Sequence, residues 1–177
     1  MLNRRLRLAG AAGALVLVTV ACRTPIENAE RRLFLQTDPY SLAEFYRARC
    51  DDDNLWLYLA ARKEPGAVEF SVALEFKVVS SVERAFTTAH ALGGLELPVE
   101  PVTEERRDSR RPFLGFVGPL GPRPVYTEQY RIPLDDAALA NLESRGLDAM
   151  LYGPNGKFRI RCEAELFQVM RKRIDGE

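Results

Sequence analysis

Residues 68–79 alternate apolar and polar side chains more strictly than any other stretch of this chain. The apolar positions are Val68, Phe70, Val72, Leu74, Phe76 and Val78, and the polar positions between them include Glu69, Ser71, Glu75 and Lys77. Successive side chains of a β-strand point to opposite faces, so this pattern predicts a strand with one face on a core and the other in water. Strands of this kind belong to antiparallel sheets with one solvated face.

Further strands are predicted from weaker alternation and from turn signals. Residues 55–61 are apolar on both sides of the alternation, which indicates a central strand. An Asn155-Gly156 turn separates the apolar runs 147–152 and 157–164, and Asn-Gly between such runs is the strongest short hairpin signal. Residues 125–132 are also expected to form a strand.

Proline limits what residues 95–102 can form. Pro98 and Pro101 remove backbone donors, so this segment is expected to be an edge strand or an extended loop.

Helices are predicted where the apolar period changes to that of an α-helix. Ser80 and Glu83 form a capping box, and the apolar residues after them follow helical spacing as far as Gly93-Gly94, which predicts a helix over 80–92. Asp135 or Asp136 starts a second predicted helix that ends at Gly146, and residues 165–174 form a third. A further capping box at Ser41–Glu44 predicts a short helical turn leading into a strand that ends at Cys50; an extended run is the alternative.

These elements together predict an α+β fold: an antiparallel sheet of five to seven strands with two or three helices packed on one face. The domain is expected to span residues 38–177. A chain of this length can bury a core of its own.

The first 22 residues have the composition of an export signal. Arg4, Arg5 and Arg7 precede an apolar run over residues 8–21, with small residues before Cys22. A basic head, a short apolar run and a small residue at the cut site are typical of a secretory signal peptide. Fourteen apolar residues are fewer than the roughly 20 that cross a bilayer. We therefore expect residues 1–21 to be removed on export.

The cut site, Thr19-Val20-Ala21-Cys22, resembles the lipobox of bacterial lipoproteins, although Leu is usual where Thr19 stands. The resemblance covers residues 1–22 only. It implies cleavage after Ala21, a diacylglycerol thioether on Cys22 and N-acylation. It also implies sorting to the outer membrane, facing the periplasm, because Arg23 is not Asp. Residues 22–37 would then be a lipidated tether. The alternative is an ordinary signal peptide with Cys22 as a spare thiol.

The two remaining cysteines, Cys50 and Cys162, are expected to form a disulfide, because an even pair in an exported protein usually does; two separately buried thiols are the alternative. A short internal similarity supports the pairing, since residues 46–51 match residues 158–163 in type at all six positions. Zinc sites use three or four nitrogen or sulfur ligands, and two cysteines with His90 are a weak candidate set, so no metal is predicted.

No motif in the chain points to catalysis. Glu69 and Glu75 are too far apart for a carboxylate pair, and His90 is expected to face solvent. Neither a nucleophile elbow nor a phosphate loop is present. The aspartates at 51–53 lack the spacing of a calcium loop and are expected to form a solvated turn.

Charge also bears on the partner class. The leader holds three of the 25 basic residues and none of the 25 acidic ones, so the mature chain is slightly acidic, which argues against a nucleic-acid partner.

Residues 103–124 are the least regular segment and the candidate partner-contact loop. The basic and aromatic side chains expected to make the contact are Arg106, Arg107, Arg110, Arg111, Phe113 and Phe116. Long irregular loops on a rigid sheet often carry function, and these would contact a partner or lipid head groups. The alternative is a short core strand followed by a rigid linker.

The sequence therefore predicts a lipid-anchored cell-envelope protein that binds another envelope component or supports an assembly, without enzymatic activity or cofactor. One alternative is a carrier of small molecules or lipids with a cavity between sheet and helices. A third hypothesis is an envelope hydrolase, which would need a cleft joining His90 to a serine and a carboxylate.

Overall fold

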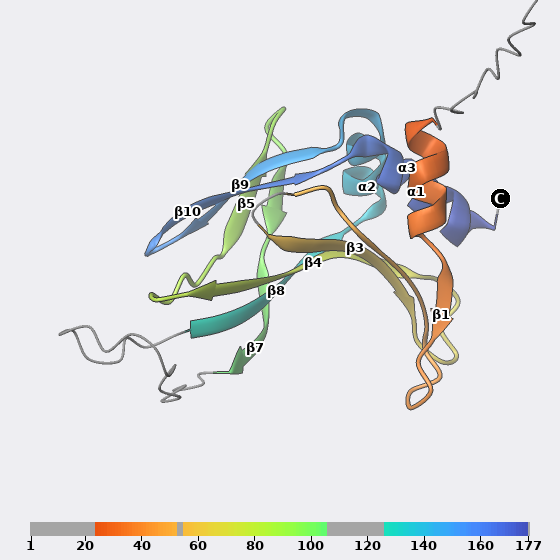
Figure 1. The fold of residues 1–177 in the computed structure, drawn as a ribbon, viewed down its shortest axis with the longest axis horizontal. Helices are drawn as coiled ribbons and strands as arrows, with labels where there is room; N and C mark the ends of the chain where they lie inside the picture. The colour runs from red at the N-terminus through yellow and green to blue at the C-terminus, as the bar shows by residue number, and fades with distance from the viewer. Residues whose placement is uncertain (1–23, 53–54, 106–125, 177) are drawn as a thin grey trace, which may run out of the picture.

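A computed structural model describes residues 24–52, 55–105 and 126–176 and folds them as two antiparallel sheets with three helices (Figure 1). The six-stranded sheet has the order β1-β2-β3-β4-β8-β7, and the four-stranded sheet has the order β10-β9-β5-β6. The bounds are α1 Pro25–Arg32, β1 Leu35–Thr37, β2 Glu44–Arg49, β3 Trp56–Lys63, β4 Ser71–Ser80, β5 Thr88–Ala91, β6 Glu96–Pro98, β7 Glu100–Glu105, β8 Tyr126–Leu134, α2 Asp136–Arg145, β9 Leu147–Gly153, β10 Gly156–Cys162 and α3 Ala164–Asp175.

One continuous core lies between the two sheets and the helices. Leu59, Leu74 and Ile132 of the six-stranded sheet are fully buried in it, together with Ile160 of the four-stranded sheet and Phe167 of α3. Helix α3 contacts both α1 and α2, and each helix contacts a strand of the six-stranded sheet. The predicted α+β class is confirmed, and the division of the strands into two sheets was not foreseen.

The elements with strong local signals lie where the sequence places them. Strand β4 buries alternate residues from Val72 to Val78, as the period-two pattern predicts. It begins at Ser71 rather than at residue 68, and Val68, which was expected to face the core, is exposed. Helix α2 begins after Asp135, whose carboxylate accepts from the Ala138 N–H at 2.7 Å, and ends at Gly146. Gly146 has a φ of +69°, and a Cβ there would lie 2.8 Å from the Cys162 carbonyl oxygen, so glycine is required.

Most of the other predicted strands and the last helix are also present. The hairpin of β9 and β10 pairs over seven residue pairs, and α3 closes the described chain. The proline-containing segment forms β6 and β7, which are edge strands of different sheets. Residues 44–49 form strand β2, and Cys50 follows it directly.

The predicted helix over 80–92 is wrong. Residues 84–87 form no helix, and residues 88–91 form β5, which pairs with β9. The Glu128 carboxylate of β8 accepts from the backbone N–H groups of Arg84 and Ala85 at 2.8 and 2.9 Å. Ala85 adopts a φ of +46°, which a helix cannot contain. In a helix, backbone carbonyl groups of nearby residues would accept from these two N–H groups. Here the Glu128 carboxylate, more than 40 residues away in the sequence, accepts from them instead.

The predicted tether differs as well. Residues 25–32 form α1, with Ala29 buried in the core, and Leu33 directly after the helix is also buried. Thr24 caps the helix in a complete capping box with Glu27. The compact domain therefore begins near residue 24 rather than at residue 38.

Candidate functional site

The outer face of the six-stranded sheet, on the side away from the core, carries an unusual set of side chains. Strand pairing fixes which residues share this face: Trp56 lies opposite Lys77, and Tyr58 lies between Arg49 and Glu75. Trp56 is 67% exposed although it stands in a strand flanked on both sides. Large exposed aromatic side chains on a rigid sheet are typical of interaction sites. We call Arg47, Arg49, Trp56, Tyr58, Glu75 and Lys77 the outer-face cluster.

Cations and aromatic rings of this cluster stack on one another. The Arg47 guanidinium lies 4.0 Å from the centre of the Tyr58 ring, and the Arg49 guanidinium lies 5.6 Å from the centre of the Trp56 ring. Both pairs are diagonal neighbours on adjacent strands, which places long side chains within reach of each other. Cation–π contacts hold the guanidinium groups in place while leaving their N–H donors available.

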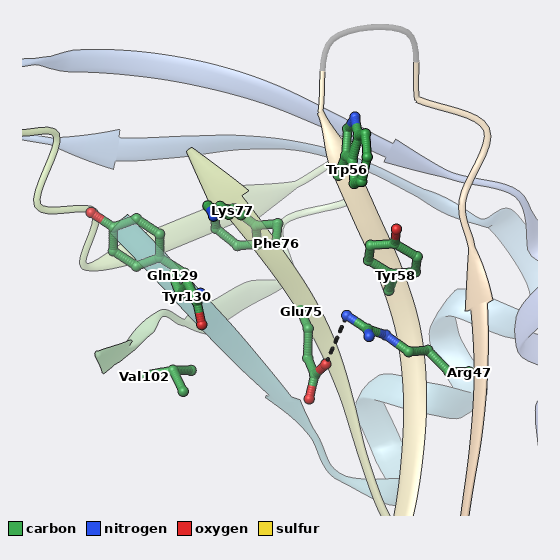
Figure 2. A pocket seen from close by; sticks show the side chains of 9 residues that line it. All are labelled: Arg47, Trp56, Tyr58, Glu75, Phe76, Lys77, Val102, Gln129 and Tyr130. Atoms are coloured by element: carbon green, nitrogen blue, oxygen red, sulfur yellow. Dashed lines mark ion pairs between the residues drawn. The ribbon is translucent and has the colours of Figure 1, made fainter. Parts of the chain in front are cut away.

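Two hollows adjoin on this face. The first, about 360 Å³, is lined by most of the outer-face cluster together with Phe76, Val102, Gln129 and Tyr130 (Figure 2). The second, about 460 Å³, lies between the turn at residues 37–40 and the middle of the sheet, where Ala60 forms part of the lining.

Arg47 and Glu75 line both hollows, so their ion pair stands where the hollows meet. The pair spans 3.5 Å, and its side chains are 44% and 41% exposed. Figure 2 shows Arg47 reaching from β2 toward Glu75 on β4, across the strand that carries Tyr58.

Charge is uneven between the two hollows. In the described part of the chain, neither Arg49 nor Lys77 takes part in an ion pair. Lys77 lines the first hollow, and Arg49 lies next to the hollow, beside Trp56. Arg62 at the second hollow pairs with Glu64 at 2.7 Å and also acts on Asp38, whose pKa is lowered mainly by hydrogen bonds from Tyr40 N–H and the Ser41 hydroxyl. The positive excess therefore lies around Trp56.

The predicted disulfide is present and joins the two sheets. Cys50 follows β2 of the six-stranded sheet, Cys162 ends β10 of the four-stranded sheet, and their Cα atoms lie 4.8 Å apart. Cys50, Cys162 and Glu163 lie close together, but the two sulfur atoms are bonded to each other and offer no thiolate to a metal.

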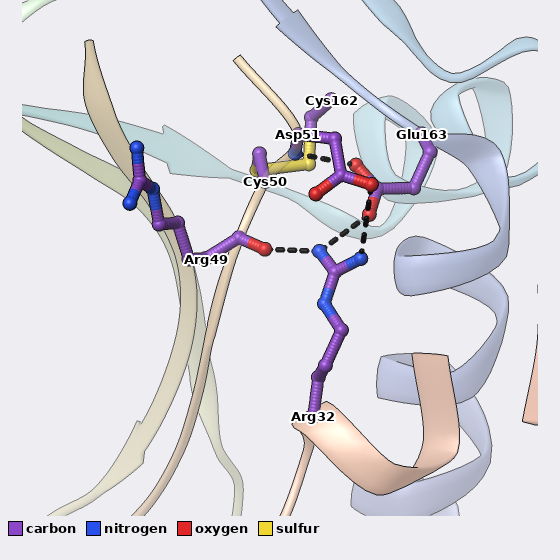
Figure 3. Close-up of polar contacts among 6 residues, drawn as sticks. All are labelled: Arg32, Arg49, Cys50, Asp51, Cys162 and Glu163. Carbon is purple, nitrogen blue, oxygen red and sulfur yellow. Dashed lines mark hydrogen bonds and ion pairs between the residues drawn. A yellow bond between two sulfur atoms is a disulfide. The ribbon is translucent and has the colours of Figure 1, made fainter. Parts of the chain in front are cut away.

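Arg32 of α1 connects the first helix, through ion pairs and a hydrogen bond, to residues next to this disulfide (Figure 3). Its guanidinium pairs with Asp51 at 3.3 Å and with Glu163 at 2.5 Å, and it also donates to the Arg49 carbonyl. Asp51 and Glu163 each follow a cysteine, so the matching six-residue segments meet at this cluster, and the Asp51 N–H donates to Glu163 at 3.0 Å. The cluster joins α1, β2 and β10, and it is structural rather than a binding site.

The solvated turn predicted at residues 51–53 is wrong for Asp52. This side chain is 7% exposed and accepts from the N–H groups of Leu55 at 3.0 Å and Arg161 at 2.8 Å. It therefore covers part of the edge of β10, whose outward N–H groups would otherwise be open to solvent. Asp51 is exposed, as expected.

The other predicted site residues fall in different places. Cys22 and the loop residues Arg106, Arg107, Arg110, Arg111, Phe113 and Phe116 lie outside the described residues. His90 is exposed, as predicted, on the four-stranded sheet, where its ring meets that of Tyr152 edge-on at 5.1 Å.

The outer-face cluster was not predicted from the sequence, because the strand at residues 55–61 was expected to be buried on both sides. Strand β3 is internal, but only its Leu57 side is fully buried. The available signal was the alternation of Arg47 and Arg49, which could have been matched to the aromatic residues of the neighbouring strand.

No family model matches this chain, and no curated protein or solved structure matches it. Among the helices in the described ranges, none is long and apolar enough to cross a membrane.

Proposed function

We propose that this protein is a lipid-anchored component of the bacterial cell envelope that binds a partner through the outer-face cluster. The observation that carries the proposal is Trp56, which is largely exposed, beside Arg49 and opposite Lys77. Trp, Tyr and Arg are the residue types that dominate binding energy at protein interfaces. A rigid sheet presents them without the entropic cost of ordering a loop.

The fold gives the proposed anchor a further consequence. Thr24 already caps α1, so only Arg23 separates Cys22 from the residue that caps the first helix. Two residue steps span about 7 Å at most. Helix α1 is in turn fixed to the domain through Ala29 and Arg32. A lipidated Cys22 would therefore hold the domain close to the bilayer, and its partner would have to lie at or near the membrane surface.

The anchor is tested by Cys22→Ser. We expect the wild-type protein to fractionate with membranes and to carry the mass of its acyl groups, because two or more chains hold a protein stably on a bilayer. The variant should lose both properties. Membrane association that survives the substitution, with no lipid-shifted mass in the wild type, would remove the anchor from the proposal.

The binding face is tested by site-specific photo-crosslinking in the native envelope. A photoreactive residue at Gln129, which is exposed in the first hollow, is compared with one at Tyr152 on the four-stranded sheet. We expect a discrete adduct from position 129 that weakens when Arg49 and Lys77 are replaced by glutamine. Adducts that form equally from position 152, or that ignore these replacements, would argue against this face.

A third hollow keeps the carrier as a second candidate. It measures about 470 Å³ and lies between β6 and α2, with a mainly apolar lining that includes Leu95, Leu97 and Pro133. An apolar ligand would fit such a lining. Saturable binding of an apolar fluorescent dye that is lost in Ala137→Lys, at an exposed position of the same lining, without change in the melting temperature, would favour the carrier.

A further inference from the structure

We propose that the surface around Trp56, formed by the first hollow and by Arg49 next to it, recognises an acidic segment of a partner protein, with carboxylates on Arg49 and Lys77 and an apolar side chain against Trp56. This inference rests on the proposed function, in which the outer face is the binding surface. It adds the chemistry of the partner, which the face alone does not specify.

The two cations beside Trp56 are available to a ligand. Arg49 and Lys77 have no carboxylate partner within the described ranges, and they flank one exposed indole ring. Each can bind a carboxylate without first breaking an ion pair of the domain. The mature chain as a whole is slightly acidic, so a local positive excess here attracts an acidic ligand to one face and not to the rest of the surface.

Arg47 is the third cation of this surface, and in the free protein it forms an ion pair with Glu75. Their pair is long, at 3.5 Å, and both side chains are well exposed, so the interaction is weak in water. A ligand carboxylate can replace Glu75 on Arg47 at little cost. Glu75 then acts as an internal competitor, and its removal should strengthen the binding of acidic ligands.

The shape of the site favours an extended peptide over a compact anion. The two hollows adjoin through Arg47 and Glu75 and together extend from the turn at residues 37–40 to Gln129 on β8. Strands β2 and β8 are three strand spacings apart, or roughly 14 Å, which an extended peptide covers with about four residues. Val102, which is exposed, adds apolar lining to the hollow that Trp56 also lines, and a phosphate ion would not use it.

The experiment uses the fluorescence of Trp56, the only tryptophan of the chain. The mature protein, purified from the envelope in an uncharged detergent, is titrated with a hexaglutamate peptide that carries one phenylalanine. A peptide with glutamine in place of every glutamate is the matched control. We expect saturable binding of the acidic peptide, at least about tenfold tighter than the control, that weakens as salt is added.

Four variants distinguish recognition from general attraction. We expect Arg49→Gln and Lys77→Gln each to weaken binding of the acidic peptide roughly fivefold, and Glu75→Gln to strengthen it roughly threefold. Lys157→Gln removes the same charge from an exposed position on β10 and should change nothing. Unchanged circular dichroism and melting temperature confirm that each variant is folded.

Several results would overturn the inference. One is equal binding of both peptides, and another is a Glu75→Gln variant that binds the acidic peptide no better than wild type. Competition by inorganic phosphate at millimolar concentration, or by vesicles of anionic lipid at equal charge, would assign the site to a phosphate or a membrane instead. If crosslinking from position 129 succeeds while the acidic peptide fails, the binding face stands and only the partner's chemistry is wrong.

Discussion

Reduction of the Cys50–Cys162 disulfide should cost this domain a large part of its stability. The two cysteines are 112 residues apart, so the bond restricts most of the unfolded chain. The loop-entropy relation gives about 4.7 kcal/mol for a loop of roughly this length. Residual structure in the unfolded chain lowers that figure, and we expect a loss of about 3–4 kcal/mol in the free energy of unfolding. The melting temperature should fall by about 10 °C or more.

The assay is urea unfolding followed by circular dichroism, with oxidised and reduced wild-type protein compared at equal concentration. Reduction removes no heavy atom, so it disturbs packing less than the Cys50→Ala/Cys162→Ala variant, which deletes both sulfur atoms. The dependence of the unfolding free energy on urea should also steepen, because the reduced unfolded chain exposes more surface. A free-energy loss below about 1 kcal/mol would refute the argument that this bond constrains the domain.

Three further predictions concern single side chains. Arg32→Gln should lower the free energy of unfolding by about 1–3 kcal/mol in urea titrations, because two carboxylates and a carbonyl lose their cation; an unchanged midpoint would contradict this. Glu128→Gln should cost about 1–3 kcal/mol and speed amide hydrogen exchange at residues 84 and 85, whereas unchanged exchange would show that the carboxylate does not hold the segment. The pKa of Asp148 is lowered, mainly by its hydrogen bond from Arg159, so its small contribution to stability is present at neutral pH and is lost as pH falls through the lowered pKa. An NMR titration of the Asp148 carboxyl checks this, and an ordinary or raised pKa would contradict it.

Local signals in the sequence were sufficient for much of the fold. The Asn155-Gly156 turn, the caps of α2 and the alternation of β4 each act over a few residues, and the structure confirms the elements they predict. The disulfide followed from the even number of cysteines that remain after Cys22 in a chain expected to be exported. The start of α1 had an equally local signal, Thr24-Pro25-Ile26-Glu27, which is a capping box with proline at the first helical position.

The predictions that were wrong concern segments whose structure depends on contacts between residues distant in sequence. Residues 84–87 have helical spacing, but Glu128 and Tyr130 of β8 bind their backbone N–H groups instead. Asp52 is buried because Arg161 lies beside it, 109 residues further along the chain. No local pattern contains either contact, so propensity alone favours the wrong structure.

The outer-face cluster was not predicted for a related reason. It exists only when three strands pair in one register, which puts Arg49 beside Tyr58 and Lys77 opposite Trp56. A shift of one residue in either pairing would send half of these side chains into the core. The sequence indicated which residues alternate, while the site depends on which residues become neighbours.

The central claim is that the face around Trp56 is occupied by a partner in the envelope, and oxidative footprinting tests it most directly. Intact envelopes and the purified protein are oxidised under the same conditions, and the oxidised fraction of Trp56 is measured by mass spectrometry, with Tyr152 on the other sheet as the internal reference. The account predicts that Trp56 is protected several-fold in the envelope relative to the purified protein, while Tyr152 is oxidised equally in both. Equal oxidation of Trp56 in the two samples would contradict it.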